Sequence, residues 1–230
     1  MIEMHDLAGA NPAIRFSPYC WRARMALAHK GLQARTIPWR FMDKEKIAFS
    51  GQGLVPVIRD GDKVVSDSWT IAEYLDSAYP DRPMLMDGQQ GKALANFARH
   101  YAQAVLGPVA MKAVLLDIYK CLDAGDQPYF RESREKRIGA TLEAFTATPE
   151  AALAAMKTAV ATLRFVVQGQ KFINGDQPAF ADYCVFGTFM WARNVSKVKL
   201  LAEDDPVYAW RERMLDLFDG LARKSAGVGA

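Results

Sequence analysis

The chain has few of the residues that bind metals or form disulfides. Its three cysteines are Cys20, Cys121 and Cys184, which lie far apart in the sequence, so no disulfide framework is expected. The three histidines are equally scattered, and no cysteine or histidine pair has the spacing of a zinc site. We therefore expect neither structural disulfides nor a bound metal.

Strong charge and long apolar runs are missing as well. The formal net charge is +3, and the charged residues are scattered, which argues against a surface that binds nucleic acid. No apolar stretch is long enough to cross a membrane, and the chain does not begin with a basic segment followed by an apolar run. The composition predicts a cytoplasmic protein that binds neither nucleic acid nor membranes.

The first part of the chain alternates strand and helix patterns. Ile2–Leu7 and Gln33–Trp39 read as strands, and the helix between them begins at Ser17-Pro18 and ends at Gly31. Two strands joined by one helix are expected to be parallel. The polar segment Arg40–Gly53 predicts one irregular helix and a loop.

A hairpin and a helix follow. Leu54–Ile58 and Lys63–Ser66 predict two strands joined by a turn at Asp60–Asp62. The next helix opens at Asp67-Ser68, whose side-chain oxygens suit a helix start, and it ends at Tyr79-Pro80. This order of elements predicts a small α/β domain with a mixed four-stranded sheet.

Pro56 is unusual within the first strand of the hairpin. Proline has no N–H for a sheet, so it belongs at an edge or at the first residue of a strand. A cis bond between Val55 and Pro56 would turn the Val55 backbone outward, where it could pair with an extended peptide ligand. Only about one X–Pro bond in twenty is cis, so the base rate favours trans.

The rest of the chain is predicted to be all-α, because no strand pattern follows Ser66. Gly107-Pro108 should bend the first helix, Arg131–Arg137 reads as a solvated helix face, and Ala222–Ala230 is expected to fray. Four segments carry the clearest helix signals, namely Gln89–Cys121, the Ala-rich run from Thr148 to Val167, the buried Pro178–Trp191, and Asp204–Leu221.

Three small polar sites could carry chemistry. Ser17 stands at a helix N-terminus, which favours an anion, and its hydroxyl could donate a hydrogen bond to a thiolate brought by a ligand. Cys20, one turn later, could be a reactive thiol or a small buried hydrophobe. Asp67-Ser68 could receive a charged amino-acid head group, and both Ser17 and Asp67-Ser68 can also be explained as simple helix caps.

Together these segments resemble the glutathione transferases, over nearly the whole chain. The most specific part is Gly53-x-Val55-Pro56-Val57-Ile58, followed by Asp67-Ser68-x-x-Ile71-x-x-Tyr74-Leu75. Gly175–Tyr183 is similar to the family's entry into the central helix, although Ala179 replaces the usual capping Ser or Thr. The resemblance implies a thioredoxin-like domain at 1–83, a linker at 84–91 and an all-α domain at 92–230.

Within the family, the chain looks most like the bacterial β-aryl etherases and the related fungal etherase-type class. This likeness rests on Ser17-Pro18-Tyr19-x-Trp21-Arg22, on Ala26–Gly31, on Tyr79–Pro83 and on Leu217–Leu221. It implies a homodimer that uses glutathione as co-substrate, with Ser17 facing the sulfur as the catalytic residue. The residues implied for holding the tripeptide are Val55, Pro56, Asp67, Ser68 and either Arg40 or Lys44.

The resemblance also implies a pocket between the domains for a hydrophobic, aromatic electrophile. Its candidate wall residues, which stand at spacings that also suit a core, are Tyr19, Phe41, Tyr101, Met111, Leu115 and Trp191. The function expected is that of a serine-type glutathione transferase. The alternatives are glutathione-dependent β-aryl ether cleavage, thiol transfer or lyase chemistry through Cys20, and a non-enzymatic glutathione-binding module.

Overall fold

A computed structural model describes residues 1–229 and contains the predicted mixed four-stranded sheet. The strand order is β2-β1-β3-β4, in which β1 (Ile2–Leu7) pairs in parallel with β2 (Ala34–Trp39) and antiparallel with β3 (Val57–Asp60). β4 (Lys63–Ser66) pairs antiparallel with β3 at the other edge. The helix α1 (Pro18–His29) connects the two parallel strands, as the sequence predicts.

The hairpin differs in detail from the prediction. β3 begins at Val57 rather than at Leu54, and Asp60 still pairs with Lys63, so the turn consists of Gly61-Asp62 alone. The Val55–Pro56 peptide bond is cis, which is the rarer of the two geometries that the sequence left open. The irregular segment after β2 contains one 3₁₀ helix, η1 (Lys44–Ser50).

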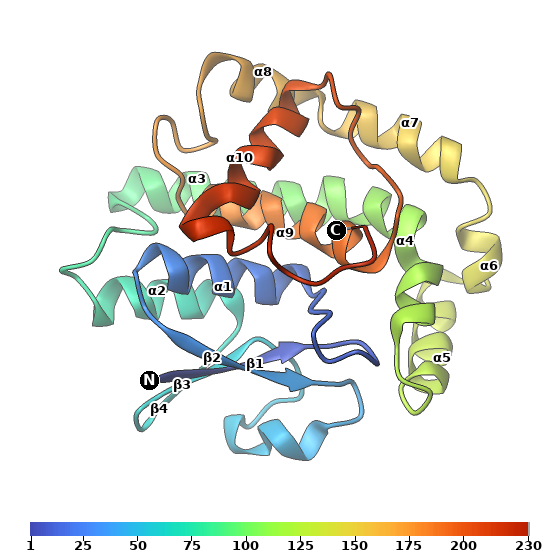
Figure 1. The fold of residues 1–230 in the computed structure, drawn as a ribbon, viewed down its shortest axis with the longest axis horizontal. Helices are drawn as coiled ribbons and strands as arrows, with labels where there is room; N and C mark the ends of the chain where they lie inside the picture. The colour runs from blue at the N-terminus through green and yellow to red at the C-terminus, as the bar shows by residue number, and fades with distance from the viewer. Residues whose placement is uncertain (230) are drawn as a thin grey trace.

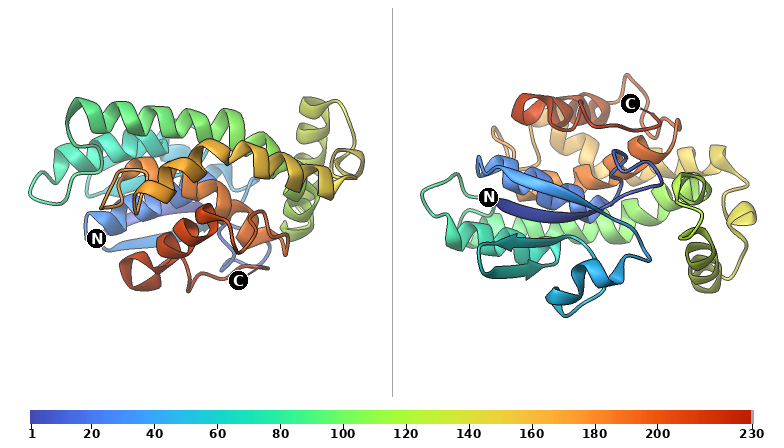
Figure 2. Two further views of the ribbon diagram at one scale, coloured as in Figure 1. Left: turned by 90° about the horizontal axis from the view of Figure 1, so that it is seen from above. Right: turned by 60° about the horizontal axis from the view of Figure 1, so that its bottom comes forward.

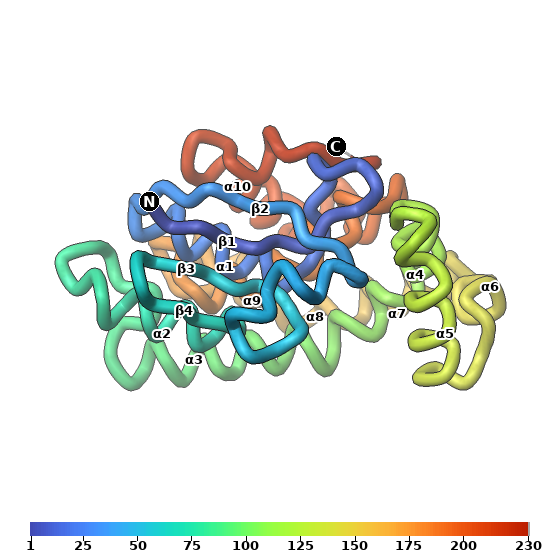
Figure 3. Tube along the Cα trace, turned by 90° about the horizontal axis from the view of Figure 1, so that it is seen from below, coloured from blue at the N-terminus to red at the C-terminus, as the bar shows by residue number. Residues whose placement is uncertain are grey.

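The sheet lies at one side of the molecule. α1 and α2 (Ser68–Ala78) lie between the sheet and the helices α3 (Gly88–Tyr101), α9 (Phe180–Val195) and α10 (Pro206–Gly220) (Figure 1). Seen from below, the strands lie in front of α1, and the segment that contains η1 crosses in front of the sheet (Figure 3). The sheet therefore has one face directed toward the helical part of the chain.

The second part of the chain is helical, and no strand element lies between residues 67 and 229. α3 begins at Gly88, within the segment 84–91 that the sequence suggests as a linker. A π-helical turn lies directly before Gly107-Pro108, where the sequence predicts a bend, and such turns accommodate a proline that lacks its N–H. The helical stretch that begins with α3 continues through this turn (green in Figure 2). The helical elements are α3 (Gly88–Tyr101), η2 (Ala102–Leu106), α4 (Gly107–Cys121), α5 (Gln127–Ile138), α6 (Leu142–Phe145), α7 (Pro149–Ala159), α8 (Ala161–Gly169), α9 (Phe180–Val195) and α10 (Pro206–Gly220).

α9 is the central helix and packs against α1, α3 and α4. Nearly all of its side chains are buried, which agrees with the apolar run in the sequence. Its start is held by Asp182, whose carboxylate accepts hydrogen bonds from the backbone N–H of Ile173 and Ala179 and from Nε1 of Trp210. Asp182 therefore makes one half of a capping box, the bond from the Ala179 N–H, while the half that a Ser or Thr side chain at position 179 would accept is missing.

The C-terminal segment is ordered against α9, so the predicted fraying is wrong for residues 222–229. Ala222 is buried, and the N–H groups of Val228 and Gly229 donate to the carbonyls of Asn194 and Arg193. Ala230 lies outside the described residues. Among the described helices, none has both the length and the apolar character needed to cross a bilayer.

Candidate active site

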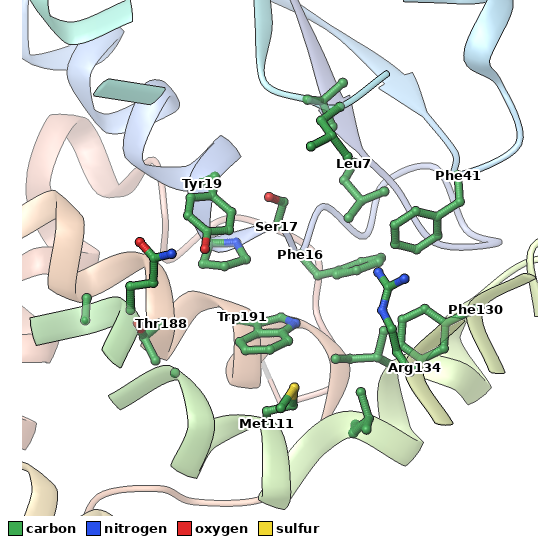
Figure 4. A pocket seen from close by; sticks show the side chains of 18 of the residues that line it. Leu7, Phe16, Ser17, Tyr19, Phe41, Met111, Phe130, Arg134, Thr188 and Trp191 are labelled. Atoms are coloured by element: carbon green, nitrogen blue, oxygen red, sulfur yellow. The ribbon is translucent and has the colours of Figure 1, made fainter. Parts of the chain in front are cut away.

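A pocket of about 460 Å³ lies between the N-terminal end of α1 and helices α4, α5 and α9 (Figure 4). This size falls within the range of small-molecule sites. Ser17 and Val55 line it, together with five of the six predicted wall residues, namely Tyr19, Phe41, Met111, Leu115 and Trp191. The pocket therefore brings together residues from both parts of the chain.

Tyr101 lies outside this pocket, contrary to the prediction. Its hydroxyl donates to the backbone carbonyl of Ala159 at the end of α7, and its ring stacks on Phe97. Burial raises the pKa of Tyr101 to about 12. Tyr101 therefore helps to join helices of the second part of the chain and is not a wall of the cavity.

Ser17 is the N-cap of α1, and its side chain faces the cavity (Figure 4). Its Oγ accepts a hydrogen bond of 3.2 Å from the backbone N–H of Cys20, and Pro18 occupies the first helical position. The hydroxyl hydrogen rotates about the Cβ–Oγ bond to suit its surroundings. The capping bond uses only a lone pair, so Ser17 can cap the helix and also donate to a group in the pocket.

The loop before Ser17 is held by hydrogen bonds to one carbonyl. Nε1 of Trp21 donates to the carbonyl oxygen of Arg15 over 2.7 Å, and Nδ2 of Asn194 donates to the same oxygen over 2.5 Å. Trp21 belongs to α1 and Asn194 to α9, so both parts of the chain fix the position of Ser17.

Cys20 does not reach the pocket. Its side chain is fully buried, and burial together with the nearby charge of Asp6 raises the thiol pKa well above its ordinary range. Asp6 is buried too, 3.7 Å from the guanidinium groups of Arg15 and Arg24, and burial raises the pKa of its carboxyl group. A protonated and enclosed thiol is a poor nucleophile. The structure thus supports the interpretation of Cys20 as a small buried residue.

A backbone hydrogen bond brings the pair Val55-Pro56 close to the pair Asp67-Ser68. The N–H of Asp67 donates to the carbonyl of Pro56 over 3.2 Å, so the start of α2 lies beside the residue that follows Val55. Oδ1 of Asp67 accepts from the N–H groups of Trp69 and Thr70 at 2.9 and 3.1 Å. Asp67 is therefore a helix cap, with its other carboxylate oxygen left for a further contact, and Ser68 is buried beside it.

Arg40 and Lys44 do not line the pocket. The Arg40 guanidinium pairs with Asp123 at 3.3 Å and donates to the carbonyl of Ala10 over 3.0 Å. Nζ of Lys44 donates to the carbonyl of Gly53 over 2.8 Å and therefore lies on the side where Val55 and Pro56 enter the sheet. Of the two, Lys44 is the one without a carboxylate partner among residues 1–229.

Asp126 positions an aromatic wall of the pocket. Its carboxylate is buried and accepts hydrogen bonds of 3.0 Å from the backbone N–H groups of Phe41 and Met42. Asp126 is the residue before α5, whereas Phe41 follows β2. This contact therefore joins the two parts of the chain directly beside the cavity.

Sequence reasoning missed three cationic residues that line the pocket, namely Arg22, Arg134 and Arg137. The run Arg131–Arg137 was expected to be a solvated helix face, and this is wrong for Arg134. Its guanidinium lies over the rings of Phe41 and Phe130, 5.2 and 4.6 Å from their centroids. The available signal was the spacing of four residues between Phe130 and Arg134, which puts both on one side of a helix.

Two family models match the chain. The model described as the C-terminal domain of glutathione S-transferase matches residues 93–212. The model described as the N-terminal domain of glutathione S-transferase matches residues 16–78. The first of these matches alone covers more than half of the chain.

Individual relatives agree with these matches. The zeta-class glutathione S-transferase of Euphorbia esula is 32% identical over 100 residues, which are 41% of this chain and 44% of the relative, so the chain spans less than half of that curated protein. The crystal structure of glutathione transferase GSTFuA3 from Phanerochaete chrysosporium aligns with a TM-score of 0.75 and 26% identity, covering 95% of this chain and 92% of that one. A glutathione S-transferase of Ceriporiopsis subvermispora, solved in complex with glutathione, has a TM-score of 0.76 and 24% identity, covering 95% and 96%.

Proposed function

The chain belongs to the glutathione S-transferase family, and we propose on this basis that it transfers glutathione to an aromatic electrophile with Ser17 as its catalytic residue. The observation that carries the proposal is the position of Ser17, whose hydroxyl stands at the start of α1 and faces an apolar cavity. The nucleophile is the sulfur of glutathione, which the protein makes more acidic.

The energy required from Ser17 is modest. A thiol of pKa about 8.5 is only a few per cent thiolate at neutral pH. Lowering its pKa by about two units makes it mostly thiolate and corresponds to about 2.7 kcal/mol. A hydrogen bond to a charged group contributes about 1.5–3 kcal/mol, and a helix N-terminus adds about 0.3–1 kcal/mol. One hydroxyl at the start of α1 is therefore sufficient.

The tripeptide is proposed to lie along the first domain, residues 1–83. The Val55 backbone beside Pro56 pairs with the cysteinyl unit, and the start of α2 holds the γ-glutamyl end. There, the free carboxylate oxygen of Asp67 receives the ammonium group, while Ser68 and the helix N-terminus receive the carboxylate. Lys44 is preferred to Arg40 for the glycyl carboxylate, because Arg40 already pairs with Asp123.

In the proposed reaction, the thiolate attacks a ring carbon that carries a leaving group. A carbon–sulfur bond forms, and the leaving group departs with the electron pair of the bond that breaks. The thiol proton has been released to solvent before the attack, so no further protein base is required. Cys20 takes no part, because it is enclosed and protonated.

Glutathione-dependent cleavage of a β-aryl ether is a second candidate function. The same thiolate would attack the ether carbon, and a phenolate would leave. The aromatic character of the cavity favours this candidate, since Phe41, Phe130 and Trp191 surround the space beside Ser17. A model β-aryl ether, assayed with and without glutathione, separates this reaction from conjugation.

The decisive test compares two variants of Ser17. Ser17→Thr keeps the hydroxyl, whereas Ser17→Gly removes it at a capping cost of only a few tenths of a kcal/mol. We expect conjugation of 1-chloro-2,4-dinitrobenzene to fall by about tenfold to a hundredfold in Ser17→Gly and much less in Ser17→Thr. The pKa of bound glutathione, measured from its thiolate absorbance against pH, should rise in Ser17→Gly and stay low in Ser17→Thr.

Two other outcomes would contradict the proposal. If Ser17→Gly keeps the low thiol pKa, then Ser17 is not the activating group. If glutathione binds but no electrophile or ether is turned over, the chain is a binding module. We further propose a homodimer located in the cytoplasm, and light scattering during size-exclusion chromatography tests the oligomeric state.

A further inference from the structure

All the charged side chains that line the pocket, among residues 1–229, are positive. Arg22, Arg134 and Arg137 line it, and its lining contains no aspartate or glutamate among residues 1–229. Arginine stays protonated at neutral pH. The space beside Ser17 therefore combines apolar and aromatic walls with positive charge that the described lining does not balance.

Of the three, Arg134 gives the strongest indication of a ligand, because its guanidinium lies against two aromatic rings. The guanidinium extends from α5 into the cavity, between Phe41 and Phe130 (Figure 4). Its Nη1 donates over 2.8 Å to the hydroxyl of Ser133, which is a neutral partner. Burial and the nearby charge of Arg137 lower the pKa of Arg134.

Another arginine of α5, Arg131, does pair with carboxylates. Arg131, one turn earlier, pairs with Glu135 and Glu143 at 2.8 Å. Arg134 makes no such pair among the described residues, although it is more enclosed. Since charges withdrawn from water are normally paired, an anion in the cavity would relieve an unfavourable arrangement.

We propose that the electrophilic substrate of this pocket is an aromatic anion, such as an aryl carboxylate, whose charged group is bound by Arg134. Arg137, which is exposed at the end of α5, attracts the same charge at the entrance, and its Nη2 lies 3.9 Å from Sδ of Met111. The ring lies on the wall formed by Met111 and Trp191, beside Ser17. This inference rests on the proposed function and specifies its substrate class.

A matched pair of electrophiles tests the preference. 4-Chloro-3,5-dinitrobenzoate differs from 1-chloro-2,4-dinitrobenzene in bearing a carboxylate opposite the reacting carbon and in its nitro positions. We expect Arg134→Met, which keeps an apolar stem over the rings, to lower the carboxylate-to-neutral ratio of kcat/KM about tenfold or more. Arg134→Lys keeps the charge and should retain part of the preference. Lys136→Gln removes a charge from an exposed position of the same helix and should retain all of it.

Binding of an unreactive pair separates this inference from the proposed function. Neither 3,5-dinitrobenzoate nor 1,3-dinitrobenzene carries a leaving group, so their dissociation constants need no catalysis. We expect the wild type to prefer the carboxylate, Arg134→Met to lose the preference, and 0.5 M salt to weaken it. If conjugation fails while this binding pattern holds, the proposed function is wrong and the anion site remains.

Two results would overturn the inference. One is equal binding of the two dinitro compounds by the wild type, or an unchanged preference in Arg134→Met. The other concerns glutathione, which also carries carboxylates. If Arg134→Met weakens the binding of glutathione alone as much as it weakens the binding of 3,5-dinitrobenzoate, then Arg134 serves the tripeptide and not the second substrate. Thermal unfolding of each variant verifies that it is folded.

Discussion

Gly187 of α9 lies so close to the carbonyl group of Pro18 that a Cβ on Gly187 would overlap the oxygen and lie 3.2 Å from the carbon. Both groups belong to backbone within helices, so neither can move aside as a side chain would. Pro18 directly follows Ser17. The absence of a side chain at position 187 therefore allows α1 and α9 to approach each other at the start of α1.

The variant Gly187→Ala should push the two helices apart. We expect the free energy of unfolding to fall by about 1–3 kcal/mol, as for other overpacked sites. Activity should fall further than stability explains, because a displacement of about 1 Å at Ser17 can cost up to a hundredfold in rate. Urea unfolding and conjugation kinetics measure the two effects.

Gly169→Ala is the matched control. Gly169 ends α8, and an added Cβ would meet nothing within 4 Å. This variant should be neutral or stabilising by up to about 1 kcal/mol. Equal effects of the two alanines would show that the contact between Gly187 and Pro18 does not limit the packing.

Asp126→Asn should loosen the wall that contains Phe41. An amide keeps the shape of the carboxylate, but it offers one oxygen where two backbone N–H groups now donate. We expect a loss of about 1–3 kcal/mol in the free energy of unfolding and a raised KM for aromatic substrates. Asp123→Asn, in the same loop, weakens a half-exposed pair with Arg40, and its amide oxygen can still accept from the N–H of Gly125, so it should cost less than about 1 kcal/mol.

Acidification should destabilise the contact between the two parts of the chain through His29. Nδ1 of His29 lies 2.7 Å from the hydroxyl of Tyr183, and Nε2 lies 3.1 Å from the carbonyl of Met84. Burial lowers the pKa of His29, with Lys30 lowering it further, while the Met84 carbonyl and Asp76 raise it. A lowered pKa means that the folded protein favours the neutral ring.

The sign of the pH effect follows from this direction. The unfolded chain takes up the proton near pH 6.5, whereas the folded chain resists it. Stability from neutral His29 is thus present above about pH 6.5 and is lost as the pH falls, at no more than about 1.4 kcal/mol per pH unit. Urea midpoints between pH 8 and pH 5 measure it, and His29→Asn should flatten the curve. Burial lowers the pKa of His5 as well, so part of the slope should remain in that variant.

Cys20 should prove dispensable for the chemistry. Cys20→Ala is expected to keep the pH profile of conjugation, with a modest loss of stability from the lost sulfur. Cys20 and Cys184 are buried and Cys121 is only partly so. A thiol reagent should therefore label Cys121 first in the folded protein. Loss of activity in Cys20→Ala with an unchanged unfolding midpoint would instead support chemistry at that thiol.

The fold could be predicted largely from local patterns. The helix cap at Ser17 and the apolar run that forms α9 each specify their element without reference to the rest of the chain. The hairpin was less certain, because Pro56 leaves both its bond geometry and the first residue of β3 to the surrounding structure. Residues 222–229 were expected to fray because chain ends are usually poorly ordered, and they are held through backbone bonds that the sequence does not reveal.

The site could be predicted less completely, because it depends on how distant segments meet. Tyr101 and Met111 both stand on the long helical stretch that begins with α3, but Tyr101 packs against the end of α7 while Met111 faces the cavity. Arg134 resembles its charged neighbours in sequence. It differs from them only because Asp126 and Phe130 bring α5 against Phe41, which is a tertiary contact.

The shared acceptor at Arg15 has a consequence for how this protein can move. One carbonyl oxygen receives both the indole of Trp21 and the amide of Asn194, and it lies two residues before Ser17. A hinge that opened the cavity by separating α1 from α9 would have to break one of these bonds and shift the serine with it. We therefore expect Ser17 to keep its position relative to α9 when a ligand binds, so that any adjustment of the cavity comes from its other walls.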